Sequence, residues 1–255
     1  MRNRYLLEVK TNKRLDATFG ATLLRAWRDA LPESLQLDRF DAGEPVRRHL
    51  TEEGDGAVTN LWAELGIPVM LARAVSPRLL MDMSWRENRG VDPRPFPWSC
   101  TVWLERKAGD SLARAMFRFL ISQFEPAFGL LTTEADARAK HWFRFNEPDG
   151  GSVEAMRGLD VTSVLPGVYW HTFFGAPAVA LLGAERSAFV ATDAEPLQGG
   201  YLVRAYDNSE LAGTPSAVTA EGSLIEAFGA SKFFHRTLIT SAAELRMPPL
   251  QARTH

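Results

Sequence analysis

Residues 165–175 read LPGVYWHTFFG, the most distinctive stretch of the chain. Successive side chains of a strand point to opposite faces of a sheet, and here both alternating faces are apolar. This pattern predicts a central strand that is buried on both sides. Just downstream, Pro177 stands where the first residue of a helix is favoured, so we expect a short helix over residues 177–182, ended by Gly183. A further strand is predicted over residues 199–206.

Strand and helix patterns are interspersed through the rest of the chain. Period-2 alternation predicts strands over residues 5–10, 79–85 and 98–107, and apolar residues at helical spacing predict helices over 17–31 and 111–124. Asp16 and Asp110 stand where the N-caps of these two helices are expected. Weaker helices are predicted over 46–51, 133–142 and 223–228, the first within a long irregular connection at 32–56.

These elements do not follow a regular strand–helix–strand rhythm, so an α+β fold is a better prediction than a doubly wound sheet. We expect a mixed or antiparallel sheet with helices packed on it. No internal repeat or obvious linker divides the chain. The prediction is therefore a single domain over residues 1–245, followed by a loose tail over 246–255.

Length and composition indicate a soluble globular protein. The chain has 255 residues, of which 45% are hydrophobic and 24% are charged, which is close to the average for such proteins. The one cysteine, Cys100, can form neither an intramolecular disulfide nor a multi-thiolate zinc site. No apolar stretch reaches the ~20 residues that span a bilayer, and residues 1–7 lack the apolar region of a signal peptide. We expect a cytoplasmic protein that does not contact a membrane.

Charge is distributed unevenly along the chain. The total of 29 basic and 31 acidic residues gives −2, which excludes the basic balance of a dedicated nucleic-acid binder. Residues 151–230 carry three Lys or Arg against nine Asp or Glu, which is −6 for this segment. A local acidic field of this kind can steer a basic partner toward the surface. The alternative is that these residues serve only solubility.

The sequence motifs of common enzyme classes are absent. No phosphate-binding G-x-x-x-x-G-K-[ST], dinucleotide-binding G-x-G-x-x-G, zinc-protease H-E-x-x-H or hydrolase G-x-S-x-G is found. We therefore expect no cofactor. The five histidines are never paired at metal-ligand spacing, so we also expect no metal. His171 remains open to two interpretations, a general base or a buried histidine that is hydrogen-bonded within its strand.

One acidic cluster supports an alternative function. Glu105 and Lys107 form an E-x-K at the end of a predicted strand, and Asp82 and Asp92 precede it in the neighbouring hairpin. Restriction-type nucleases hold Mg²⁺ with acidic residues in such a position, and period-2 spacing directs the carboxylate and the ammonium to the same phosphate. A metal-dependent nuclease is thus the alternative, although a surface ion pair explains the same residues.

The region around the distinctive stretch resembles a known family. Residues 159–161 (LDV), 165–175, 182–183 (LG) and 199–203 (GGYLV) together resemble the type VI secretion immunity family, with the best match at 159–203. The resemblance implies an α+β protein that binds a cognate toxic effector and blocks its active site without catalysis. In this family the effector is often a nuclease of the virus-type replication-repair class. The oligomeric state and the effector's identity stay open.

This resemblance and the acidic segment together predict a binding surface. An inhibitor of a DNA-binding enzyme can place carboxylates where the enzyme holds phosphates. We expect acidic residues downstream of the buried strand to approach a basic effector, namely Asp193, Glu195, Asp207 and Glu210. The competing interpretation is that they lie in ordinary solvated loops. Gly167, Trp170 and Gly175 are predicted to be structural, the glycines for tight turns at the strand ends and the tryptophan for the core.

Overall fold

A computed structural model describes most of the chain. The described residues are 3–11, 15–16, 18–65, 70–84, 98–146, 152–156, 164–183, 189, 192 and 194–234. The predicted tail at 246–255 and residues 159–161 of the family-like region lie outside them, as do Asp92 and Asp193. No helix in this described portion has the length and apolar composition that a bilayer crossing requires.

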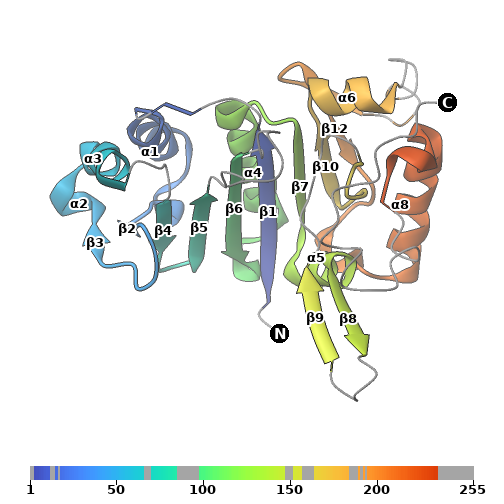
Figure 1. The fold of residues 1–255 in the computed structure, drawn as a ribbon, viewed down its shortest axis with the longest axis horizontal. Helices are drawn as coiled ribbons and strands as arrows, with labels where there is room; N and C mark the ends of the chain where they lie inside the picture. The colour runs from blue at the N-terminus through green and yellow to red at the C-terminus, as the bar shows by residue number, and fades with distance from the viewer. Residues whose placement is uncertain are drawn as a thin grey trace.

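A ten-stranded antiparallel sheet forms the centre of the molecule (Figure 1). Its strands lie in the order β11-β12-β10-β7-β1-β6-β5-β4-β2-β3, so β1 from the N-terminus lies in the middle. This confirms the predicted α+β class. The strands of the sheet are β1 (Arg4–Thr11), β2 (Arg39–Asp41), β3 (Arg48–His49), β4 (Met70–Ala74), β5 (Leu79–Ser84), β6 (Trp98–Glu105), β7 (Phe128–Thr133), β10 (His171–Phe174), β11 (Glu195–Leu197) and β12 (Gly200–Arg204).

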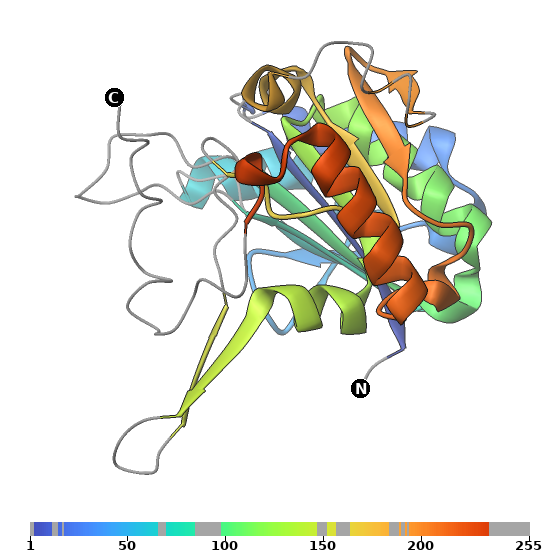
Figure 2. The same cartoon turned by 90° about the vertical axis from the view of Figure 1, so that its right-hand side faces the viewer.

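Helices cover both faces of the sheet. On one face, α1 (Phe19–Ala30), α3 (Gly56–Leu65) and α4 (Asp110–Phe124) form the larger core cluster with alternate residues of the strands. On the other, α6 (Ala176–Leu182) and the end of α8 (Pro215–Phe228) pack on β7, β10 and β12. The α5 helix (Glu134–His141) leads into a hairpin of β8 (Trp142–Asn146) and β9 (Ser152–Met156), which projects from the body of the molecule (Figure 2).

Several sequence predictions need correction. The connection at 32–56 is less irregular than expected, because it contains β2, β3 and the short helix α2 (Leu50–Glu53). The last helix begins at Pro215 and is longer than predicted, since Thr214 caps it by accepting a bond from the Ala217 amide at 3.3 Å. Neither predicted aspartate is the N-cap of its helix. Thr18 occupies that place in α1 and Gly109 in α4.

The carboxylates of these two aspartates bind elsewhere. Asp16 accepts hydrogen bonds from the amide and hydroxyl of Thr18, at 2.9 and 2.7 Å. Asp110 accepts one from the Tyr5 hydroxyl at 2.6 Å and two from Ser209, whose hydroxyl and amide donate at 2.5 and 3.0 Å. Although burial opposes the effect, the hydrogen bonds from Ser209 and Tyr5 lower the pKa of Asp110. This carboxylate thus joins β1, α4 and the segment after β12.

The distinctive stretch forms a shorter strand than predicted. Only His171–Phe174 belongs to the sheet, as β10, and all four residues are buried, as expected. The strand lies third from one edge and not at the centre. Gly175, predicted to allow a turn, has an ordinary φ of −72°. Its role is close approach, because a Cβ at this position would lie 2.0 Å from the carbonyl oxygen of Pro126.

This contact generates the first prediction. The Gly175→Ala substitution should lower the free energy of unfolding by at least about 3 kcal/mol, because the added methyl group meets backbone that cannot rotate away. Gly222→Ala in α8 is the control, since no atom lies within 4 Å of its Cβ position, and it should leave stability unchanged or raise it by about 0.5–1 kcal/mol. Denaturant unfolding followed by circular dichroism measures both. Equal stability of the two variants would contradict the packing argument.

Candidate functional site

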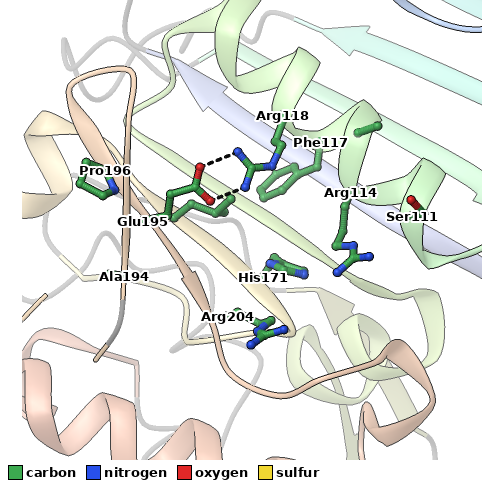
Figure 3. Close-up of a pocket in the computed structure, with 11 residues that line it drawn as sticks. Ser111, Arg114, Phe117, Arg118, His171, Ala194, Glu195, Pro196 and Arg204 are labelled. Carbon is green, nitrogen blue, oxygen red and sulfur yellow. Dashed lines mark hydrogen bonds and ion pairs between the residues drawn. The ribbon is translucent and has the colours of Figure 1, made fainter. Parts of the chain in front are cut away.

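A pocket of about 710 Å³ lies between α4 and the strands β10, β11 and β12. Three arginines, a histidine and a glutamate line it, together with small and apolar residues (Figure 3). The charged and polar lining residues are Ser111, Arg114, Arg118, His171, Glu195 and Arg204. The pocket brings together basic, acidic, polar and apolar side chains, and we take it as the candidate site.

The helix and the strands position these side chains in a simple way. Ser111, Arg114 and Arg118 are three and four residues apart on α4, so they share one face of the helix. In the sheet, His171 pairs with Arg204 and Glu195 pairs with Leu202, and side chains paired across strands lie on the same face. The helix approaches closely at Gly129 of β7, where a Cβ would lie 3.2 Å from the Phe117 ring.

Glu195 and Arg118 form an ion pair at the rim of the pocket (Figure 3). Arg118 donates two hydrogen bonds to the carboxylate, one from Nη1 to Oε1 at 2.7 Å and one from Nη2 to Oε2. The bond from Arg118 lowers the pKa of Glu195. Both side chains are close to half exposed, at 44% and 49%. An exposed pair of this kind contributes at most about 1 kcal/mol to stability and can exchange partners.

His171 is the buried polar group of the pocket. Its side chain is only 6% exposed, and its ring packs edge-on against Trp170 with centroids 4.7 Å apart. Neither ring nitrogen has a hydrogen-bond partner among the described residues. The sequence left open whether His171 is a general base or a buried histidine that is hydrogen-bonded within its strand. Its burial is confirmed, whereas the expected hydrogen bond is not found among the described residues. Burial first, and then the charges of Arg114, Arg204 and Arg118, lower the pKa of His171 to about 3.

The other two arginines are less firmly paired than Arg118. Arg114 has neither an ion pair nor a hydrogen bond with any side chain in the described ranges. Arg204 is exposed, and its Nη1 lies 3.8 Å from a carboxylate oxygen of Asp207, which is 86% exposed. In the view of Figure 3, His171 lies between these two arginines. This side of the pocket therefore carries positive charge without a close counter-charge among the residues that the structure describes.

Three of the four acidic residues predicted to contact a partner lie within the described part of the chain. Glu195 and Asp207 are each near an arginine, so the local charge is mixed and not simply acidic. Glu210 is exposed in a short 3-10 helix, where its amide donates to the Asn208 side chain at 3.2 Å. Asp193 lies outside the described residues. None of the three arginines was predicted from the sequence, although the spacing of Arg114 and Arg118, four apart on the polar face of an amphipathic helix, indicates that they share a surface.

The residues of the nuclease alternative are not brought together. Asp82 pairs with Thr101 across β5 and β6, and Thr101 stands four residues before Glu105, or about 13 Å at ~3.3 Å per residue. Glu105 accepts from the Arg78 amide and forms an ion pair with Lys107, both at 3.0 Å. Asp92 lies outside the described residues. Within the portion of the chain that the structure covers, no three His, Cys, Asp or Glu side chains form a group suited to a metal.

A second charged cluster joins α5 to α8. Lys140 donates to Asp136 at 2.9 Å and to Glu221 at 2.7 Å, and its ammonium lies 4.7 Å from the centre of the Tyr169 ring. The carboxylates are almost fully buried, at 2% and 7% exposure. Burial raises the pKa of Glu221, and Lys140 opposes this shift. All three charges have partners inside the protein, so the cluster acts as a structural tie between the two helices.

Comparisons with known proteins identify a likeness of fold. No family model matches the chain, and no curated protein matches it. Among solved structures, the chain is similar to the Pseudomonas aeruginosa T6SS protein PA0821, with a TM-score of 0.53 and 11% sequence identity. The match covers 88% of this chain and 73% of that protein. At this identity the comparison shows that the two share an arrangement of strands and helices.

The lysine cluster gives a prediction about stability. Lys140→Met should lower the free energy of unfolding by about 3–5 kcal/mol, because it leaves two buried carboxylates without their counter-charge. The matched control is Lys107→Met, which removes an exposed pair with Glu105 and should cost less than about 1 kcal/mol. Urea unfolding at neutral pH measures both. If the two variants lose the same stability, the cluster is not the tie described.

The pocket histidine gives a prediction about pH. A histidine whose folded pKa lies below the unfolded value of about 6.5 stabilises the protein fully above that pH. Stability is then lost as pH falls from about 6.5 toward 3, by up to about 1.4 kcal/mol per pH unit, because only the unfolded chain takes up the proton. The His171→Asn variant should lack this part of the slope, measured by urea unfolding between pH 4 and 7.5.

An independent readout is the imidazole nitrogen spectrum of His171 by NMR. It should show a neutral ring throughout that pH range. His49→Gln, on β3 at the other edge of the sheet, controls for the loss of one imidazole from the unfolded chain. A His171 ring that titrates above pH 5 would contradict the assigned burial.

Proposed function

We propose that this protein is an immunity protein of a type VI secretion system, which binds a cognate toxic effector and neutralises it by stoichiometric inhibition. The observation that supports this most directly is the fold likeness to a T6SS protein over 88% of the chain. The resemblance of residues 159–203 to the immunity family, noted from sequence alone, points the same way. The first observation rests on backbone arrangement and the second on residue identity.

The chemistry of the candidate site suits binding better than catalysis. Its charged groups are three arginines and one glutamate that forms an ion pair with Arg118, and such groups suit contacts with charged partners. Its histidine, with a pKa of about 3, is a weak base. Guanidinium groups are also frequent at the strongest contacts of protein interfaces. We therefore place effector contact on this face and propose no reaction for it.

The proposed contact surface is the rim formed by β11, the end of β12 and the segment that follows. It carries Glu195, Asp207 and Glu210 in exposed positions, and Asp193 precedes it in sequence. A basic effector surface, such as the phosphate-binding surface of a nuclease, can take Glu195 from Arg118, because an exposed ion pair costs little to break. In the proposed mechanism, the immunity protein covers the effector's active site and excludes its substrate.

The test is co-purification with the product of the adjacent gene, followed by binding kinetics and a growth assay with that toxin. The parent protein should form a stable complex whose association rate falls with salt, and it should restore growth. A triple reversal, Glu195→Lys with Asp207→Lys and Glu210→Lys, should slow association at least about tenfold.

The matched control is Glu226→Lys, an exposed position on α8 over the opposite face of the sheet. It should bind as the parent does. Failure of the neighbour to bind would remove the proposed function, whereas binding that is insensitive to the triple reversal would remove only the proposed surface.

A further inference from the structure

The pocket contains an arginine that lacks a counter-charge. Arg114 is half-buried on α4, and no described side chain forms an ion pair or hydrogen bond with it. A guanidinium presents five N–H donors in a fixed planar arrangement that matches the oxygens of a carboxylate or phosphate. Arg204, across the pocket, has only the distant carboxylate of Asp207 at 3.8 Å. Two sets of donors are therefore open to an incoming anion.

His171 adds a buried donor between these arginines. The ring is 6% exposed, lines the pocket, and has no hydrogen-bond partner on either nitrogen among the described residues. Leaving a buried polar group without a partner carries a free-energy cost. A ligand that accepts a hydrogen bond from the imidazole N–H recovers this free energy. The ring of His171 lines the pocket, and its nitrogens have no partner among the described residues. These two facts point to a ligand with an acceptor oxygen.

Charge and volume narrow the class of occupant. Three lining arginines against one lining glutamate leave two net positive charges, which a doubly charged anion balances. The glutamate already engages Arg118 with both oxygens, so the open donors belong to Arg114, Arg204 and His171. A volume of about 710 Å³ is within the range of ~300–1,000 Å³ found for small-molecule sites. The apolar part of the lining is formed by Ala115, Phe117, Ala194, Pro196 and Leu202.

We propose that this pocket binds the phosphate group of a small phosphorylated molecule. Arg114 and Arg204 hold its terminal oxygens, His171 donates one hydrogen bond, and the organic part of the ligand lies along the apolar lining. A dianionic phosphate has three terminal oxygens for three donor groups, whereas a single carboxylate has two oxygens and half the charge. This inference goes beyond the proposed function, because it concerns a ligand of the immunity protein alone.

The test is isothermal titration with pyrophosphate at low salt. The parent protein should bind one equivalent with a dissociation constant below about 1 mM. The Arg114→Gln and Arg204→Gln substitutions should each weaken binding at least about tenfold. Arg25→Gln, an exposed arginine on α1 away from the pocket, is the matched control and should bind as the parent does. Circular dichroism and thermal unfolding establish that the variants are folded.

A second measurement reports on the pocket directly. The imidazole nitrogen resonances of His171 should shift on addition of pyrophosphate to the parent and not to Arg114→Gln. Absence of binding, or equal binding by Arg114→Gln, overturns the proposal. Citrate binding as tightly as pyrophosphate also overturns it, because the site then selects carboxylates. Loss of effector binding in Arg114→Gln without any pyrophosphate binding assigns the pocket to an acidic side chain of the effector instead. The effector assay contains no phosphate, so its result tests the proposed function alone. The pyrophosphate titration tests the phosphate site alone.

Discussion

The pairing of β1 with a strand on each of its edges is the interaction on which the rest of the structure depends. All eight of its residues pair with β6, and six of them pair with β7. Because both neighbours are antiparallel to β1, they run parallel to each other, and α4 connects them across one face. Asp110 at the start of α4 receives hydrogen bonds from Tyr5 of β1 and from Ser209. The helix is thereby fixed over the sheet, and with it Arg114 and Arg118 of the pocket.

Close approach between backbone segments then determines how tightly the strands beside the pocket pack. A Cβ at Gly175 would clash with Pro126, and one at Gly200 would lie 2.2 Å from the carbonyl oxygen of Phe174. These two glycines let β10, β12 and the turn before β7 pack tightly, while Gly129 lets the Phe117 ring approach the sheet. Close packing thus explains the need for glycine at positions 175 and 200, whereas Gly167, Gly183 and Gly199 of the family-like region have positive φ angles of 148°, 57° and 73°. The close packing at positions 175 and 200 holds the wall that carries His171.

The net charge of the segment 151–230 differs in sign from the charge that lines the pocket. The segment 151–230 is −6 from its own residues, yet the pocket has three arginines against one glutamate. The difference arises because Arg114 and Arg118 come from α4, well before that segment, and Arg118 pairs with a glutamate 77 positions away. A count along the chain includes only sequence neighbours, whereas an electric field is produced by all charges close in space. The charge around the pocket is accordingly mixed, with three arginines and one glutamate in its lining.

The sequence by itself determined the α+β class and the approximate limits of β1, β5, β6, α4, α5 and α6, because periodicity and turn residues are local properties of a chain. It also identified His171 and Glu195 as residues of interest. Only the tertiary structure decided which donors surround them, and it gives the ring nitrogens of His171 no hydrogen-bond partner within the described part of the chain. It also directed Asp110 toward Tyr5 and Ser209 and not to its own helix end. Those outcomes depend on strand order and on contacts between distant residues, for which a local pattern contains no information.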